Sequence, residues 1–231
     1  MTRKEKMEKA KAALVRAERA KKKLLRAAIE RNAKSPAAHH NYAILLVREG
    51  DGETALAVLN RALTFRLKVI TEKNIRLTVA SCYWVMEDID KAIETLEDMR
   101  VRYEYVNVHV LTSLGYMYFL RGETDKALEF TNLALEDAPD NGAAWDNLGQ
   151  IYFSLNEAEK AKEAFETAVS HKPDLPDSNY YLGLIAENED DGEKALEYFS
   201  KAMECGLSAL NTVTKEQIEE KYMKFLDRIS E

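Results

Sequence analysis

Glycine, proline, cysteine and long apolar runs are all scarce in this chain. Its 231 residues include only 9 glycines, 4 prolines and 2 cysteines, while Ala, Glu, Lys and Leu recur throughout. This composition favours helix, and no segment shows the period-two alternation that is typical of a strand. No stretch approaches 18 consecutive apolar residues, and the N-terminus is too charged for a signal peptide. We therefore expect an all-α, cytoplasmic protein, unless a leader segment has been removed.

Residue patterns that carry catalysis or metal binding are also missing. The sequence contains no Gly-rich phosphate loop, no G-x-S-x-G and no Cys/His metal signature. Adjacent helical residues point about 100° apart, so His39 and His40 cannot hold one metal ion together. Cys82 lies among apolar neighbours, as a small buried side chain would, and Cys205 falls at no metal-like spacing from it. The sequence therefore predicts no catalytic residue, no metal site and no cofactor, and we do not expect an enzyme.

The charge of the chain is unevenly distributed. The formal net charge is -7, yet residues 1–34 hold 13 Lys and Arg against 4 Asp and Glu. This N-terminal arm therefore carries a formal charge of +9 and the remainder of the chain carries −16. A basic arm of this kind can bind anionic lipid, nucleic acid or an acidic protein surface, including the body of a second copy of the chain.

One stretch of 34 residues, from Gly142 to Leu175, has the most regular spacing in the chain. The spacing is W-x2-L-G-x2-Y, then A-x3-F-x2-A and a closing proline, formed by Trp145, Leu148, Gly149, Tyr152, Ala161, Phe165, Ala168 and Pro173. Two antiparallel helices of about 14 residues would cross closely at the small residues Gly149 and Ala161. One such pair cannot bury its apolar face alone, so the pattern predicts neighbouring copies.

Neighbouring copies lie on both sides of this stretch. The small residues of the first helices are Ala43, Ala80, Gly115, Gly149 and Gly183, at spacings of 37, 35, 34 and 34. This pattern resembles that of the tetratricopeptide repeat (TPR) family. The resemblance implies an all-α TPR solenoid, a right-handed superhelix of antiparallel helix pairs, with five units at residues 36–72, 73–107, 108–141, 142–175 and 176–209. Residues 1–35 would form a basic N-terminal helix and cap, and residues 210–231 a C-terminal capping helix.

Turn and cap signals place the helices within each unit. We expect first helices at about 36–49, 73–87, 108–121, 142–155 and 176–189, and second helices at about 53–66, 90–103, 124–137, 158–171 and 192–204. Ser35 followed by Pro36 is typical of a helix start. The longer spacings indicate insertions near 66–72 and 101–107, where second helices can extend. Lys215 to Ile229 is predicted to be an amphipathic terminal helix.

The resemblance also implies where a ligand would bind. In this family the first helices line a concave groove, and repeat positions two, five, nine, twelve and thirteen tend to contact ligand. Carried over by register, the candidate groove residues are His40, Ile44, Leu77, Ser81, Trp84, His109, Thr112, Tyr116, Phe119, Asp146, Gln150, Phe153, Tyr180 and Leu184; the full register also includes Asp177. Position twelve is aromatic in three successive units, so we expect an aromatic strip along the groove. The alternative is that these rings pack between helices.

The same register argues against one known type of ligand. Family members that grip the C-terminal carboxylate of heat-shock chaperones use Lys, Asn and Arg at positions two, five, six and nine. Here only Asn41, Asn74 and Asn147 are of a suitable type, and no lysine or arginine stands at a clamp position. The groove is therefore expected to suit an amphipathic helix or an extended apolar peptide.

The sequence thus predicts a non-enzymatic scaffold for protein–protein interaction with a protein or peptide partner. No nucleic acid partner is expected. The alternative is a self-assembling or membrane-peripheral adaptor, in which the basic N-terminal helix makes the main contact with a second copy or with a membrane surface.

Overall fold

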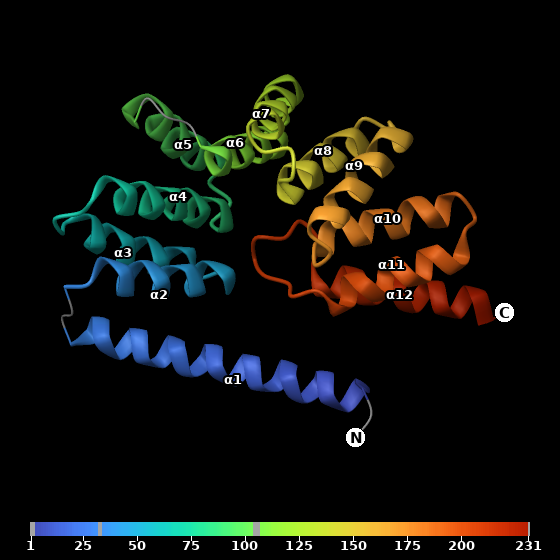
Figure 1. The fold of residues 1–231 in the computed structure, drawn as a ribbon, viewed down its shortest axis with the longest axis horizontal. Coiled ribbons are helices and arrows are strands. Elements are labelled where there is room, and N and C mark those ends of the chain that lie inside the picture. Colours follow the sequence, from blue (N-terminus) through green and yellow to red (C-terminus); the bar gives the residue numbers. More distant parts are fainter. Residues whose placement is uncertain (1–2, 32–33, 104–106, 231) are drawn as a thin grey trace. The chain divides into compact units, whose positions relative to one another are not determined.

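All the regular secondary structure in the described part of the chain is α-helix. The computed structural model describes residues 3–31, 34–103 and 107–230 (Figure 1). Its helices are α1 (Arg3–Glu30), α2 (Pro36–Arg48), α3 (Gly52–Leu63), α4 (Val69–Val85), α5 (Ile89–Tyr103), α6 (Val108–Leu120), α7 (Thr124–Asp137), α8 (Gly142–Ser154), α9 (Ala158–His171), α10 (Pro176–Asn188), α11 (Gly192–Glu204) and α12 (Lys215–Ser230). The predicted all-α class is confirmed. Within these ranges, no helix is long and apolar enough to cross a membrane.

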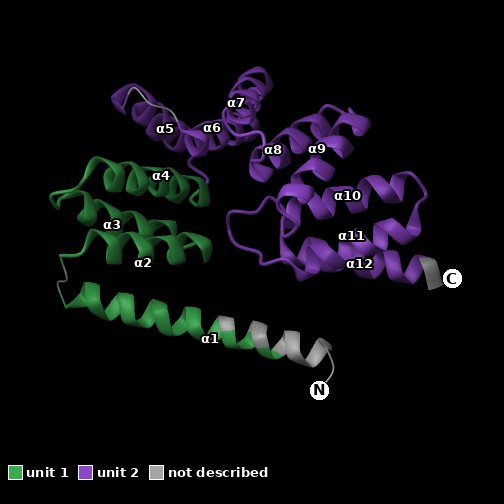
Figure 2. Ribbon diagram, viewed as in Figure 1, with its two compact units in different colours: residues 1–86 green, residues 87–231 purple. Residues whose placement is uncertain are grey.

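The chain divides into two compact units, which Figure 2 shows in different colours. Unit 1 is Met1–Met86 and holds α1 to α4, and unit 2 is Glu87–Glu231 and holds α5 to α12. The division falls between α4 and α5, inside the stretch 73–107 that the sequence assigns to a single repeat. The predicted domains at 1–35, 36–209 and 210–231 therefore stay predictions, as does the number of repeats.

In unit 1, α2 packs against α3, α3 against α4, and α1 against α2. The core between these helices is made of small and branched side chains, and Ala43, Leu46, Ala55, Leu59 and Ile75 are almost fully buried there. The N-terminus of α2 is capped as the sequence predicts, because the backbone N–H of residue 38 donates to Ser35 Oγ at 3.2 Å.

The connection between α3 and α4 differs from the sequence expectation. The sequence predicts that α3 continues to residue 66 and that α4 begins at 73, whereas α3 ends at Leu63 and α4 begins at Val69. Thr64 Oγ1 donates a 2.8 Å hydrogen bond to the backbone carbonyl of Arg61. A side-chain bond of this kind competes with the backbone hydrogen bonds that would continue the helix. Phe65 then packs edge-on against the ring of His39, with centroids 5.2 Å apart. The insertion therefore lengthens α4 rather than α3.

Unit 2 contains three helix pairs, α6 with α7, α8 with α9 and α10 with α11, and each pair stacks on the next. A Cβ atom added to Gly149 would lie 2.5 Å from Phe165 Cδ1, and one added to Gly183 would lie 2.5 Å from Phe199 Cε1. Both phenylalanine side chains are fully buried. Each glycine therefore leaves the space that an aromatic ring of the second helix fills. The predicted close crossing at Gly149 is confirmed.

The terminal helix α12 packs against α11. Ile218 and Phe225 of α12 are buried, and the rings of Phe225 and Phe199 have centroids 5.9 Å apart. The predicted apolar face of this helix is confirmed for these two residues, while the side chain of Ile229 lies outside the described part of the structure. α12 thus covers apolar surface that α11 would otherwise expose.

The turn between the two helices of a pair recurs with one backbone conformation. Among the described residues, those with φ between 58° and 85° are Gly50, Glu87, Gly122, Asn156 and Asp190. Each lies seven positions after the small residue of its first helix, so their spacings are again 37, 35, 34 and 34. The conformational energy of this left-handed region is low for glycine and higher for a residue such as glutamate. The backbone therefore shows the same repeat as the side-chain pattern.

Candidate functional site

The first helices of unit 2 lie next to one another, since α6 contacts α8 and α8 contacts α10. We call the surface that these three helices share the first-helix face of unit 2. The predicted site residues on these helices differ in exposure: His109 is exposed, Thr112, Phe119, Phe153, Tyr180 and Leu184 are half-buried, and Tyr116, Asp146 and Gln150 are buried. The structure therefore brings the unit 2 candidates together, but several of them already have partners within the chain.

The buried polar residues form one hydrogen-bonded chain across this face. Gln150 Nε2 donates to Asp146 Oδ2 at 2.8 Å, and Ser178 Oγ donates to the other oxygen of the same carboxyl group. Thr212 Oγ1 donates to Gln150 Oε1 at 2.9 Å and lies 2.6 Å from the Tyr116 hydroxyl. Because Thr212 has a single hydroxyl proton, Tyr116 must be the donor in the second contact.

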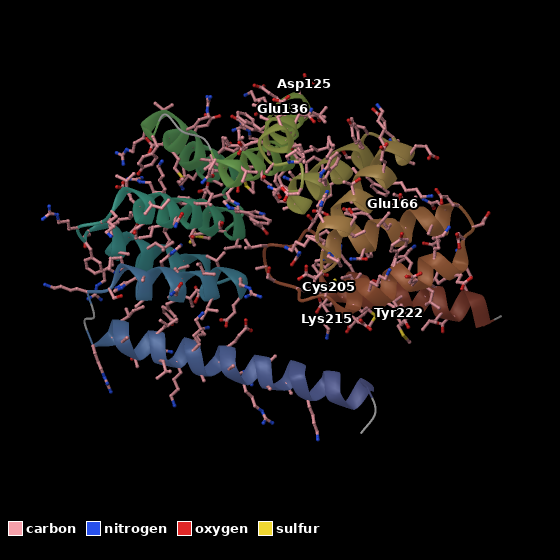
Figure 3. All side chains as sticks on the ribbon, in the orientation of Figure 1. Asp125, Glu136, Glu166, Cys205, Lys215 and Tyr222 are labelled. Atoms are coloured by element: carbon pink, nitrogen blue, oxygen red, sulfur yellow. The ribbon has the colours of Figure 1, made fainter. Side chains whose placement is uncertain are left out.

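Thr212 belongs to the connection between α11 and α12, residues 205–214, which we call the strap. Figure 3 labels Cys205, the first residue of the strap, and Lys215, the first residue of α12. The strap makes two further contacts with α10, because Asn211 Nδ2 donates to Asp177 Oδ2 and the backbone N–H of Val213 donates to Asp177 Oδ1, both at 2.8 Å. The strap therefore binds side chains from α6, α8 and α10 at once.

Burial makes the two carboxyl groups of this face hard to ionise. It raises the pKa of Asp146, and the nearby charge of Asp177 raises it further, while the hydrogen bonds from Ser178 and Gln150 act in the opposite direction. Burial likewise raises the pKa of Asp177, opposed by the hydrogen bonds that the strap donates. Buried acceptors of this kind need hydrogen-bond donors, so the face favours a ligand rich in N–H and O–H groups over an anionic one.

Two of the predicted groove aromatics take part in the packing of unit 2. The ring centroid of Phe153 lies 4.9 Å from that of Tyr181, whose ring stacks on Phe165 at 5.2 Å. Tyr180 contacts both Tyr181 and Phe199, with centroids 5.8 and 6.0 Å apart. Phe153 is at position twelve of its repeat, and its ring packs between α8 and α10, which is the alternative that the sequence leaves open for that position.

Thr112 is also engaged in holding α6 and α8 together. Asn147, which the clamp register singles out, is buried and donates from Nδ2 to the backbone carbonyl of Thr112 at 2.9 Å. Asn141 Nδ2 donates to Thr112 Oγ1 at 3.2 Å. Asn147 therefore has a packing role here.

The unit 1 candidates lie on α2 and α4, which contact each other. His40 Nε2 lies 2.8 Å from Thr78 Oγ1, and that hydroxyl donates its proton to the backbone carbonyl of residue 74, so the imidazole is the donor. Burial lowers the pKa of His40. Ile44 is 37% exposed, and Leu77, Ser81 and Trp84 are half-buried. Among the described residues of α2 and α4 no carboxyl group is buried, whereas the face of unit 2 has Asp146 and Asp177.

The basic helix α1 is attached to unit 1 through α2. Lys22 pairs with Glu49, and Arg48 lies 3.4 Å from Glu18. Leu24 of the same helix is 72% exposed. Part of α1 is thus fixed on the repeat, and apolar side chains remain on its exposed surface.

The described residues contain no group of three or more His, Cys, Asp and Glu side chains that could hold a metal ion. His39 is fully buried and its Nδ1 lies 2.9 Å from the backbone carbonyl of Ser35, while His40 is half-buried and bound to α4. The two histidines therefore serve separate structural contacts.

The sequence did not identify the strap as part of the site. Asp177 is in the full register, but Asn211, Thr212 and Val213 follow the last repeat and have no periodic pattern that would place them. Thr212 lies 62 residues from Gln150 and 96 from Tyr116 along the chain. Only the tertiary structure brings these groups together.

Comparisons with known proteins bear on the fold. Three family models described as tetratricopeptide repeat match residues 118–187, 80–142 and 36–61, together more than half of the chain. No curated protein matches the sequence.

Three solved structures illustrate the likeness. A thermophilic TPR protein of Thermus thermophilus is similar with a TM-score of 0.66 and 18% identity, over 83% of this chain and 99% of that chain. MamA is similar with a TM-score of 0.50 and 25% identity, over 76% of this chain and 92% of that chain. The APC/C hetero-tetramer Cut9–Hcn1 gives a TM-score of 0.66 at 15% identity, over 89% of this chain and 39% of that chain. With the paired helices and the recurring turn, these matches confirm the predicted TPR solenoid, and the chain belongs to the tetratricopeptide repeat family.

Proposed function

We propose that this chain is a non-enzymatic scaffold that binds a peptide or helix of a partner protein on the first-helix faces of its repeats. One observation carries the proposal: side chains of α6, α8 and α10 already bind a non-helical polypeptide segment, the strap, through Tyr116, Gln150 and Asp177. The three side chains occupy ligand positions of the family register. A surface that binds one peptide segment by side-chain hydrogen bonds has the chemistry to bind another.

Unit 1 offers a second face of different chemistry. Ile44 on α2 is 37% exposed, and Leu77 and Trp84 on α4 are half-buried. Apolar side chains at these positions suit the apolar residues of a partner helix or extended peptide. A ligand of unit 1 therefore needs apolar side chains, whereas a ligand of α6, α8 and α10 needs hydrogen-bond donors.

The test is a selection of peptides from a random displayed library on the full chain, followed by affinity measurement on variants. Ile44→Ala and Phe119→Ala should each lower the affinity of the peptides selected on the same face by up to about thirtyfold, the loss that follows truncation of an anchoring side chain. Leu133→Ala is the matched control, since Leu133 is 40% exposed but lies on the second helix α7. Peptides that bind equally well to both first-helix variants, once their melting temperatures are shown to be unchanged, would contradict the proposal.

The second candidate is self-association or membrane attachment through α1, and the exposed Val15 on a helix within the basic arm favours it. An arm of charge +9 and a remainder of −16 attract each other between two copies, and this attraction weakens with salt. Light scattering should then show a dimer that becomes a monomer when residues 1–19 are deleted. Vesicles of anionic lipid that retain the full chain and not the deletion would support the membrane form instead. A monomer that binds no vesicle would exclude both.

A further inference from the structure

The strap is a segment with fixed ends and a polar middle. Leu207 and Val213 pack with Ala202 of α11 and Ile218 of α12 in one apolar cluster. Of residues 205–214, only Val213 is buried; the others are half-buried or exposed. Tyr180 and Tyr181 of α10 pack against the same cluster, so both ends of the strap belong to the core that joins α10, α11 and α12, while its middle lies on the first-helix face.

A tight turn presents the polar middle. The backbone N–H of Asn211 donates to the carbonyl of Ser208 at 3.1 Å, and the N–H of Ser208 donates to Asn211 Oδ1 at 2.9 Å. The second bond occupies the oxygen of the Asn211 amide, so its Nδ2 group is left to donate to Asp177. The next residue, Thr212, then places its hydroxyl between Gln150 and Tyr116.

The contacts that the strap makes are those of a peptide ligand. The strap donates three of its four hydrogen bonds to the face, from one amide side chain, one backbone N–H and one hydroxyl, and it accepts the fourth from Tyr116; the four bonds reach α6, α8 and α10. None of the three residues that they reach, Tyr116, Gln150 and Asp177, belongs to the apolar cluster that fixes the strap ends. Asn211 and Thr212 can thus leave the face, and the Val213 N–H can leave Asp177, while the Val213 side chain stays in the cluster that joins α11 to α12.

We propose that the strap is a built-in ligand of the first-helix face of unit 2, and that a partner binds there by displacing it. The partner segment would be uncharged and non-helical, with an amide side chain and a backbone N–H for Asp177 and a hydroxyl between Gln150 and Tyr116. The proposal rests on the proposed function, because it names the ligand chemistry of the same face.

Tethering gives the strap an advantage over a free peptide. A short tether holds a ligand at an effective concentration of the order of millimolar, so the strap competes with any partner that uses the same residues. Each hydrogen bond that the strap releases is made again by a partner of matching chemistry, so the exchange leaves no buried acceptor unpaired. Weakening the strap should therefore strengthen the binding of a partner.

The first experiment uses the full chain and a fluorescent synthetic peptide of residues 206–214, GLSALNTVT. The double variant Asn211→Ala/Thr212→Ala loses the strap contacts made by side chains but keeps the Val213 anchor, and it should bind the peptide at least about tenfold more tightly than the wild type. Adding Asp177→Asn should abolish this gain, since an amide has one oxygen where the carboxyl group offers two. Ala209→Ser is the control, because Ala209 lies in the strap and is exposed.

The second measurement is hydrogen exchange on the wild-type chain, with and without a peptide selected from the random library. Displacement predicts faster exchange at the strap, including the Val213 amide, and slower exchange in α6, α8 and α10. A double variant that keeps the wild-type melting temperature but binds the 206–214 peptide no better than the wild type would overturn the proposal. So would a library peptide that protects α6, α8 and α10 while the strap stays protected. In that last case the scaffold function stands and the built-in ligand does not; if no library peptide binds either face, the scaffold function itself fails.

Discussion

Units 1 and 2 solve the same packing problem with different residues. At the helix crossing, unit 1 has Ala43 and, sixteen residues later, Leu59, while unit 2 has Gly149 and Phe165 at the same separation. All four residues are buried. The extra methyl group on the first helix of unit 1 is matched by a smaller side chain on the second helix. These two repeats therefore maintain the filled volume at the crossing rather than the residue types.

The first-helix faces differ in a similar way. On α2 and α4 a single histidine–threonine contact accompanies exposed and half-buried apolar side chains. On α6, α8 and α10 two buried carboxyl groups require donors, and the chain supplies them in part from its own strap. An apolar face can stay open to water at modest cost, whereas buried carboxyl groups without donors cannot. The polar face thus needs an occupant, and the apolar face does not.

The largest effect is expected where the crossing is tightest. Gly149→Leu forces a side chain into space held by the Phe165 ring, whose Cδ1 would lie 2.5 Å from the new Cβ. The loss should be about 3 kcal/mol, which lowers Tm by roughly 6–12 °C in a unit of this size. Gly206→Ala is the control, because a Cβ on Gly206 meets nothing within 4 Å. Equal melting temperatures for the two variants would contradict the packing described for α8 and α9.

The volume comparison can be tested directly by moving the unit 1 pair into unit 2. Gly149→Ala alone should cost about 1–3 kcal/mol through overpacking, and Phe165→Leu alone about 1 kcal/mol or more through the cavity it leaves. The double variant recreates the Ala43 and Leu59 pair and should cost less than the sum of the two single changes. Thermal unfolding of all four proteins gives the coupling energy. Simple additivity would show that the two pairs are not equivalent.

The pH dependence of stability should change when one buried carboxyl group is removed. The folded-state pKa of Asp146 is raised above the ordinary value of 3.8. The contribution of this group to the free energy of unfolding is therefore largest below pH 3.8 and is lost as the pH rises through the folded-state pKa. Asp146→Asn does not titrate, and it gives up one of the two hydrogen bonds that Asp146 accepts at every pH. Its free energy of unfolding relative to that of the wild type should therefore be at least about 1 kcal/mol higher at pH 7 than at pH 4. Melting curves between pH 4 and 8 give the difference. Parallel profiles for the two proteins would show that Asp146 does not titrate in this way; Asp177 and Lys172 are the charged groups that act on it.

The smallest effect concerns the left-handed turn. This position is glycine in Gly50 of unit 1 and in Gly122 of unit 2, with φ of 85° and 82°, whereas unit 2 also has Glu87 there, with φ of 61°. Glu87→Gly should raise the free energy of unfolding by about 0.5–1 kcal/mol, and Gly50→Glu should lower it by a similar amount. Chemical denaturation resolves changes of this size if the slope of the transition is unchanged. A loss of stability in Glu87→Gly would mean that the side chain of Glu87 contributes more than its backbone strain costs.

The repeat register was predictable because it depends on local spacing. Gly149, Ala161 and Phe165 mark the crossing within 17 residues, and the structure places them as the pattern requires. The connection between α3 and α4 was not predictable, because it contains a tertiary contact, between Phe65 and His39, that no local pattern indicates. Predicted boundaries were accurate to one or two residues wherever no insertion occurs.

The candidate site was predictable only in part, and for the same reason. The register selected Tyr116, Asp146 and Gln150 as first-helix residues, and they do lie together on one hydrogen-bonded network. Their partner Thr212 is outside the periodic pattern and distant in sequence. A repeat pattern can therefore indicate which side chains share a face, while the segment that occupies the face must be found in three dimensions.

The two cysteines give the strap a natural site for a spectroscopic probe. Cys82 is fully buried in α4, and burial raises the pKa of its thiol to about 12, so almost none of it is thiolate at neutral pH. Cys205 is half-buried and forms the junction between α11 and the strap. A thiol-reactive dye should therefore attach at the strap and leave the core unmodified. Because no substitution is needed, the fluorescence of the attached dye could then follow the movement of the strap in real time.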